Sequence, residues 1–255
     1  DVLSDGVGGA IVVWIDQRSA PYDVFAQRVS GAGTLLWGGG GVSICAAEDA
    51  QHSIHAVVDG AGGAVVAWTD ERDLYPVIYA QRVNASGTPL WTGDGVPIST
   101  AQWSQGNSTV VSDGNGGAIV AWADNREGGD IDVYAQRLNP GGVPQWTVNG
   151  VPVCTAAEGQ TEPVIISDGG GGAIIGWEDG RVQVGTDVYA QRLNGEGIPL
   201  WSFNGVPLCL AAGSQARLEM VTDGAGGAIA MWVDGRTGLG AADLYTQRMD
   251  AAGAS

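Results

Sequence analysis

The sequence predicts an all-β fold, a five-bladed β-propeller, and a repeated unit is the main reason. The dipeptide Asp-Gly recurs five times, at intervals of 54 to 55 residues. Each copy continues through Gly-Gly-Ala, an apolar run ending in Trp, an Asp-x-Arg motif and a Gln-Arg pair. A period near 50 residues with several short strands is typical of propeller blades. The 43 Gly and 10 Trp among 255 residues suit tight turns between short strands packed by a few large aromatic side chains.

The repeats divide one predicted domain, residues 1–255, into units at about 1–54, 55–108, 109–163, 164–218 and 219–255. The fourth unit predicts strands at 163–167, 173–177 and 187–193, and a fourth, outer strand that opens at 199–201 and leads to 209. Glycines at 169–172 allow the first turn. A Gln closes each connection to the next unit, where we expect its amide to bind neighbouring backbone: Gln51, Gln105, Gln160 and Gln215.

The last unit lacks the Trp-bearing outer strand, so we expect its blade to have three strands. Three explanations stay open: a genuinely three-stranded blade, a sequence that is part of a longer chain, or completion by a neighbouring molecule. Because an exposed strand edge invites pairing, a strand-mediated contact is expected there.

The charge pattern excludes some partners. The formal net charge is −17, and all eleven basic residues are Arg. Ten of them occupy two repeated positions, which leaves only Arg217. We therefore expect neither nucleic-acid binding nor attraction to anionic membranes. No apolar segment approaches the roughly 20 residues of a membrane-spanning helix, so no membrane insertion is expected.

The three cysteines occupy the same place in their units, and Ser99 fills that place in another copy. Equivalent positions on different blades should lie too far apart for a disulfide. We interpret Cys45, Cys154 and Cys209 as small buried residues, neither bridged nor metal-bound.

Two repeated polar motifs predict a scaffold of ion pairs. Asp-x-Arg supplies a "loop Asp" and a "loop Arg" in each unit: Asp16/Arg18, Asp70/Arg72, Asp124/Arg126, Asp179/Arg181 and Asp234/Arg236. Gln-Arg supplies a "strand Arg": Arg28, Arg82, Arg137, Arg192 and Arg248. The loop Asp occurs in all five copies, so we expect it to bind the strand Arg, whose planar guanidinium suits bidentate pairing and stacking on Trp. Nine of the ten Trp are also in register and are expected in the core between blades.

The stretch from Asp187 to Trp201 resembles a degenerate Asp-box repeat, as in sialidase-like secreted bacterial proteins. The Gly and Trp of that motif survive, as in Gly197/Trp201, while its defining Asp does not. The resemblance covers nearly the whole chain and implies a propeller fold and an extracellular or cell-surface location. The resemblance does not extend to the arginine triad of sialidases, because every Arg except Arg217 belongs to the repeat.

Residues that differ between the repeats are the best candidates for function. Variation gathers in the loop after Asp-x-Arg (19–22, 73–76, 127–131, 182–186 and 237–242) and in the connection between units. The candidate ligand-binding residues are Trp103, Gln102, His52, His55, Glu162 and Arg217. Trp103 beside Gln102 could stack on a sugar or pack on a neighbouring loop. We expect a non-catalytic binding module for a glycan or protein ligand, with no cofactor.

Two alternatives stay open. A structural or assembly scaffold fits the regular repeat. A glycosidase would need convergent carboxylates, for which the acids outside the repeat are candidates: Glu48, Asp49, Glu158, Glu162, Glu178 and Glu219. His52 and His55 lie three apart, so on a regular strand they would point to opposite faces, which weakens a shared metal site. The Asp-Gly turns lack the alternating Asp of a calcium loop, and no metal is expected.

Overall fold

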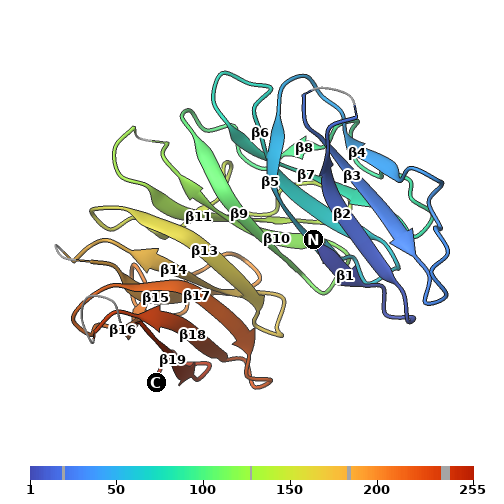
Figure 1. Cartoon of the computed structure of the whole chain (residues 1–255). Coiled ribbons are helices and arrows are strands. Elements are labelled where there is room, and N and C mark those ends of the chain that lie inside the picture. The colour runs from blue at the N-terminus through green and yellow to red at the C-terminus, as the bar shows by residue number, and fades with distance from the viewer. Residues whose placement is uncertain (19–20, 127, 183–184, 237–241) are drawn as a thin grey trace. The chain divides into compact units, whose positions relative to one another are not determined.

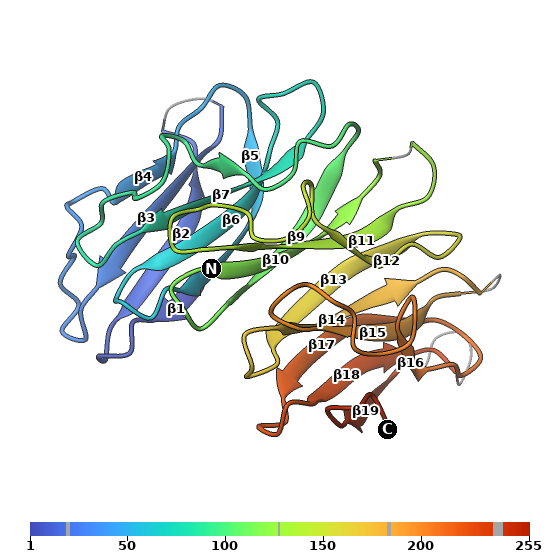
Figure 2. The same ribbon diagram turned by 180° about the vertical axis from the view of Figure 1, so that it is seen from behind.

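The computed structural model describes residues 1–255 except 19–20, 127, 183–184 and 237–241, and within the described chain every regular element is a β-strand (Figures 1 and 2). The strands form five antiparallel sheets, one for each repeat. Four sheets have four strands and the last has three. The chain thus has the all-β, five-bladed propeller fold that the repeats predict, including the missing outer strand of the last blade.

The strands follow one order in each blade. Blade 1 contains β1 (Val2–Ser4), β2 (Ala10–Asp16), β3 (Asp23–Val29) and β4 (Val42–Cys45). Blade 2 contains β5 (Gln51–Val58), β6 (Ala64–Asp70), β7 (Val77–Val83) and β8 (Val96–Pro97). Blade 3 contains β9 (Gln105–Ser112), β10 (Ala118–Asp124), β11 (Asp132–Leu138) and β12 (Val151–Cys154). Blade 4 contains β13 (Gln160–Ser167), β14 (Ala173–Asp179), β15 (Asp187–Leu193) and β16 (Val206–Cys209). Blade 5 contains β17 (Gln215–Thr222), β18 (Ala228–Asp234) and β19 (Asp243–Met249).

The chain divides into two compact units. One comprises residues 1–120 and 136–150, and the other comprises 121–135 and 151–255. Blade 3 contributes to both. The prediction of a single domain stays a prediction.

The outer strand begins later than the sequence predicts. In blade 4, Pro199 forms only an isolated bridge with Leu193, and the strand proper starts at Val206. Trp201 lies in the segment between them, where its backbone N–H donates to Gln191 Oε1 rather than to a strand ladder. The aromatic residue therefore precedes the outer strand instead of opening it.

Consecutive blades pack face to face within two hydrophobic clusters, one in blades 1 and 2 and one in blades 4 and 5. Ile11 and Val13 of blade 1 pack in one cluster with Val66 and Trp68 of blade 2. Ile174 of blade 4 packs in the same way with Trp232 of blade 5. Eight of the nine in-register Trp are buried, and Trp14 in blade 1 is half-buried. The expectation that these Trp form core between blades is confirmed for the buried eight.

The prediction that the strand Arg binds the loop Asp is wrong. Arg82 binds Asp59, the Asp of the Asp-Gly turn, through Nε at 3.0 Å and Nη2 at 2.8 Å. The other Asp59 oxygen accepts the N–H groups of Ala61 and Gly63 and so closes the turn. The same pair forms in every blade, because the turn places its Asp beside the strand Arg: Asp5–Arg28, Asp113–Arg137, Asp168–Arg192 and Asp223–Arg248.

The loop Asp instead binds its own loop Arg and the Trp before it. Asp70 accepts hydrogen bonds from Trp68 Nε1 at 2.7 Å and from Arg72 Nε at 2.7 Å. The Arg72 guanidinium lies 4.1 Å from the centre of the Tyr79 ring, so it stacks on Tyr and not on Trp. Arg72 Nη2 also reaches Cys45 Sγ of blade 1 at 3.1 Å. All ten repeated Arg form ion pairs, as the scaffold interpretation predicts: Arg18, Arg28, Arg72, Arg82, Arg126, Arg137, Arg181, Arg192, Arg236 and Arg248.

The cysteines are free thiols that pack against these loop Arg residues. Cys45 and Cys154 are buried and Cys209 is half-buried. Burial raises the pKa of Cys45 to about 12 and that of Cys154 to about 11, which keeps both thiols neutral at ordinary pH. The prediction that no cysteine is bridged is confirmed.

Candidate functional site

Two pockets at equivalent places in blades 2 and 3 bring the variable segments together. The blade 2 pocket, about 500 Å³, lies between the loop after Asp-x-Arg (Asp73, Leu74, Tyr75 and Val77) and the segment after the outer strand (Ser99, Thr100, Ala101 and Gln102). The blade 3 pocket, about 670 Å³, is lined by Gly129, Asp130, Asp132, Tyr134, Pro152, Thr155, Ala156 and Ala157. The two segments that vary most in sequence thus form the walls of one kind of site.

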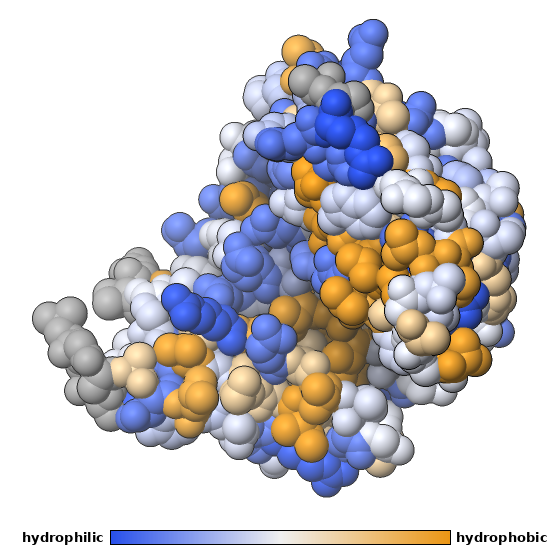
Figure 3. All heavy atoms as spheres, turned by 45° about the vertical axis from the view of Figure 1, so that its right-hand side comes forward, coloured by the Kyte–Doolittle hydropathy of each residue, from blue (hydrophilic) through white to orange (hydrophobic). Residues whose placement is uncertain are grey.

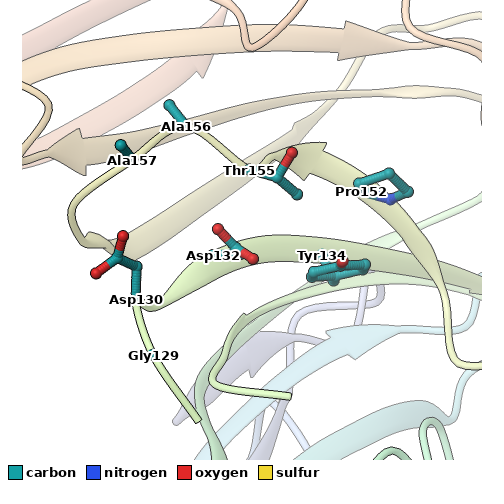
Figure 4. A pocket seen from close by; sticks show the side chains of 8 residues that line it. All are labelled: Gly129, Asp130, Asp132, Tyr134, Pro152, Thr155, Ala156 and Ala157. Atoms are coloured by element: carbon teal, nitrogen blue, oxygen red, sulfur yellow. The ribbon is translucent and has the colours of Figure 1, made fainter. Parts of the chain in front are cut away.

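Figure 4 shows how the blade 3 pocket is built. Asp130, Asp132 and Tyr134 line one side, and residues 152–157 line the other. The Asp130 carboxylate accepts the backbone N–H of Glu158 at 2.9 Å, which joins the loop to the connection between blades. The Arg126 guanidinium lies over the Tyr134 ring, 3.4 Å from its centre. The pocket therefore offers carboxylate acceptors beside one aromatic edge.

The blade 2 pocket has an additional aromatic pair at its rim. Trp103 follows the lining residue Gln102 and lies with its ring 5.2 Å from that of Tyr75, at an interplanar angle of 36°. Trp103 is 44% exposed, as its position in the connection predicts. It packs on a neighbouring loop and still presents a surface to solvent. The packing interpretation of this residue is confirmed, and stacking on a sugar stays a prediction.

The backbone of Trp103 is in the left-handed region, with φ of 71°. The residues at the same place in the other connections share this conformation: Asp49, Glu158 and Gly213. The Gln two residues later binds the connection's backbone, as expected. Gln160 Nε2, for example, donates to Glu158 O at 2.8 Å. The repeat thus imposes a left-handed residue that points outward at this place.

The inner strands carry a second left-handed position, at a β-bulge. The register shifts between His52 and His55 in β5, between Thr161 and Val164 in β13 and between Ala216 and Glu219 in β17. The residues with positive φ at these bulges are Ser53, Glu162 and Arg217, and Asn107 has the same conformation at the equivalent place in β9. All four are exposed, and all four differ in type. A bulge redirects a side chain out of the strand, so Glu162 and Arg217 project from the scaffold.

The bulge overturns the expectation for the two histidines. His52 and His55 stand opposite Thr69 and Ala67, which are two apart and share a face of the sheet, so simple alternation does not apply. The two imidazoles nevertheless contact different partners. His52 Nε2 lies 3.2 Å from Glu71 Oε1, and His55 Nδ1 lies 2.5 Å from Ser108 O.

Glu162 and Arg217 converge on a third residue, Glu178 of β14. The backbone N–H of Arg217 donates to Glu178 Oε1 at 2.7 Å. Burial raises the pKa of Glu178, and the negative charge of Glu162 raises it further, against the opposing effect of the Arg217 N–H group and charge. Trp103 and Gln102 thus lie together at the blade 2 pocket, and Glu162 and Arg217 lie together beside Glu178. The two histidines lie in neither group.

The sequence located the segments of the pockets but not the residues inside them. Tyr75 and Asp130 went unmarked, although their loops were identified as variable, and so did Tyr134 of β11. Every blade has a Tyr or Phe at the position of Tyr134. The repeat therefore made Tyr134 look like a scaffold residue rather than part of a pocket wall. The parts of the variable loops at 19–20, 127, 183–184 and 237–241 lie outside the described residues.

Two negative observations are limited to the described chain. No group of three His, Cys, Asp or Glu side chains there is arranged to hold a metal ion. No helix among those residues has the length and apolar character needed to cross a membrane.

Comparison with known proteins supports the fold. The structure resembles an endo-arabinase from Bacteroides thetaiotaomicron with a TM-score of 0.51 and 12% identity, over 97% of this chain and 92% of that one. It also resembles a protein of unknown function from Dyadobacter fermentans with a TM-score of 0.61 and 8% identity, over 99% and 78%. At these identities the likeness concerns the fold alone. No family model and no curated protein matches the chain.

Proposed function

We propose that this chain is a glycan-binding propeller whose principal site is the blade 2 pocket with Trp103 at its rim. The observation that carries the proposal is Trp103 itself. Left-handed backbone costs a non-glycine residue roughly 1–2 kcal/mol, and the same place in another connection holds Gly213. A large aromatic side chain kept at a strained and exposed position is explained by a role in recognition.

The chemistry of the pocket fits a sugar ring. Trp103 and Tyr75 present aromatic surface to its apolar C–H groups, and the neighbouring polar groups of Gln102, Thr100 and Asp73 can bind its hydroxyls. Because the chain carries −17 charges and its ten repeated Arg are paired, the ligand should be neutral rather than anionic.

The blade 3 pocket supplies a second, different site. It has Tyr134 and two carboxylates but Ala157 in place of Gln102. Two related pockets in one chain would favour a polymeric or branched glycan through multivalent binding. The Asp-box-like resemblance and the extracellular or cell-surface location belong to the same proposal, since such glycans are found outside the cell.

A glycan array followed by isothermal titration calorimetry tests this function. The probes are neutral oligosaccharides of arabinose, xylose, mannose and glucose. We expect binding that Trp103→Ala weakens at least tenfold, which corresponds to about 1.4 kcal/mol. Phe203→Ala, which removes an exposed aromatic side chain that lines neither pocket, is the matched control and should keep the wild-type affinity. Absence of binding to every probe would contradict the proposal and favour a scaffold role.

A hydrolase is the second candidate because of Glu178. A carboxyl with a raised pKa beside a second carboxylate is the arrangement of an acid and its partner in glycoside hydrolysis. The test is hydrolysis of p-nitrophenyl glycosides by the wild-type chain and by Glu178→Gln and Glu162→Gln. A hydrolase would lose activity in both variants, and the wild-type rate would fall as the pH rises through the raised pKa of Glu178. No turnover in the wild-type chain would remove this candidate.

A further inference from the structure

Three polar side chains at one end of blade 2 form a chain of hydrogen bonds that neither proposed function uses. His52 Nδ1 lies 3.0 Å from Ser53 Oγ, and His52 Nε2 lies 3.2 Å from Glu71 Oε1. The order is hydroxyl, imidazole and carboxylate. It is the arrangement of a serine nucleophile, its general base and the acid that orients the base. Both distances are within the reach that such groups need.

The carboxylate decides which nitrogen of the imidazole can act as a base. An ionised carboxylate only accepts hydrogen bonds, so its contact with Glu71 places the proton of the neutral His52 ring on Nε2. Nδ1 then has a lone pair, which accepts the hydrogen bond of the Ser53 hydroxyl. The imidazole is therefore in the tautomer that can remove the proton from Ser53 Oγ.

The repeat supplies the backbone that brings these side chains together. Ser53 has a φ of 52° at the bulge of β5, which turns its side chain out of the strand. The N–H of Glu71 donates to Ala50 O at 3.0 Å, and Gly180 and Gly235 make the equivalent bond in blades 4 and 5. The position of Glu71 beside the start of the inner strand is thus a property of the scaffold.

The side chains, in contrast, belong to blade 2 alone. The position of His52 holds other residues in the later blades: Gly106, Thr161 and Ala216. The position of Glu71 also differs in every other blade: Gln17, Asn125, Gly180 and Gly235. Because blades 4 and 5 form the bulge and the backbone bond without a His or a Glu, the fold does not require these side chains.

The group is open to solvent. The side chains of His52 and Glu71 are 46% and 45% exposed, and Ser53 is exposed as well. Hydrophilic side chains gather at the top of the view in Figure 3, where the loops at this end of blades 1 and 2 lie. None of the three residues lines the blade 2 or the blade 3 pocket, so the group is separate from the proposed glycan sites.

We propose that Ser53 is a nucleophile that takes an acyl group from a carboxylic ester, with His52 as its general base and Glu71 as the residue that positions the base. Ser53 Oγ attacks the carbonyl carbon of the ester while its proton moves to His52 Nδ1. The ester C–O bond breaks, and the leaving alcohol takes that proton. Water then attacks the acyl carbon and gives a proton to Nδ1, and Ser53 Oγ leaves with this proton. The net reaction hydrolyses an ester to an acid and an alcohol.

Labelling of the whole chain with a fluorophosphonate tests the nucleophile, because an activated serine hydroxyl displaces fluoride from this reagent. We expect one adduct, located on Ser53 by peptide mass spectrometry, and release of p-nitrophenol from p-nitrophenyl acetate. Ser53→Ala should abolish the adduct and slow the release of p-nitrophenol about tenfold or more. Ser86→Ala is the matched control and should change neither, because Ser86 is an exposed serine whose hydroxyl binds Asn84 instead of an imidazole.

Variants of the other two residues test their roles, after circular dichroism melting establishes that each is folded. His52→Ala should be labelled about a hundredfold more slowly, and added imidazole should restore much of the rate, which it would not do for a packing defect. Glu71→Gln keeps the size and an acceptor oxygen but loses the charge, so we expect labelling about tenfold slower. A contact that only holds His52 in place would survive that change.

Three results would each overturn the proposal: a wild-type chain without an adduct on Ser53, labelling of Ser53→Ala at the wild-type level, or labelling of His52→Ala at the wild-type rate. A Glu71→Gln variant that is labelled at the wild-type rate would overturn the positioning role of Glu71.

Discussion

Trp103 shows how a repeated scaffold can hold a side chain that the repeat itself does not specify. The connection between blades requires left-handed backbone two residues before the buried Gln. Gly213 meets that requirement without steric cost, whereas Trp103 meets it with strain offset by its contact with Tyr75. The same logic applies to Glu162 and Arg217 at the bulges, where the backbone is shared and the side chains differ.

The strain at Trp103 predicts an order of stabilities. Both Trp103→Ala and Trp103→Gly lose the contact with Tyr75, but only Gly relieves the left-handed backbone. We expect Trp103→Gly to be more stable than Trp103→Ala by about 1 kcal/mol in urea unfolding, although both should bind glycan more weakly than the wild-type chain. Equal stability, or a more stable Ala variant, would show that the backbone there is not strained.

The pair of turn Asp and strand Arg is the unit that fixes each hairpin. One carboxylate oxygen of Asp59 closes the turn and the other binds Arg82 of the third strand. Arg82 also donates to Pro140 O in the next blade at 3.3 Å. A single Arg thus links the turn, its own sheet and the neighbouring blade.

Replacing Arg82 should cost far more than replacing Arg248, although both occupy the same place in the repeat. Arg82→Ala leaves the buried Asp59 carboxylate without its counter-charge, so we expect a loss of about 3 kcal/mol in unfolding free energy. Arg248 is mostly exposed and should contribute much less in the monomer. Chemical denaturation of the two variants and the wild-type chain at low protein concentration makes the comparison. Similar losses would contradict the dependence on burial.

The same pair in blade 4 predicts loss of stability in acid. Burial alone would raise the pKa of Asp168, but the Gly170 and Gly172 N–H groups and Arg192 hold it below its ordinary value. A lowered pKa in the folded state gives stability that is complete above the unfolded value, about 3.9, and is lost as the pH falls through the folded value. Asp168→Asn should reduce this loss of stability below about pH 4 in denaturation experiments. An unchanged pH dependence would show that Asp168 is not the group responsible.

Periodicity in the sequence was enough to predict the blades, the buried Trp and the three-stranded last sheet. It could not assign the Asp–Arg partners, because two Asp per unit recur equally and only the turn geometry decides between them. The shift of His52 and His55 escaped prediction for a similar reason, since the bulge at Ser53 is a backbone feature without a sequence signature. The pocket residues were missed because Tyr134 repeats like a scaffold residue.

At the scale of the whole molecule, the repeat separates scaffold from function. It assigns ten of eleven Arg to ion pairs and leaves a short set of residues that differ between blades. Those residues lie at two kinds of place, the pockets beside the variable loops and the bulges of the inner strands. For the ligand-binding function that we propose, the net charge of −17 would disfavour anions.

The most direct test of this account is a two-dimensional ¹H–¹⁵N NMR spectrum of the ten Trp indole groups during titration with the neutral oligosaccharides. Trp103→Phe assigns the Trp103 signal by its disappearance. The account predicts that a bound oligosaccharide shifts the Trp103 indole and leaves the nine in-register Trp signals in place. Shifts confined to the in-register Trp, or no shift with any of the oligosaccharides, would contradict it.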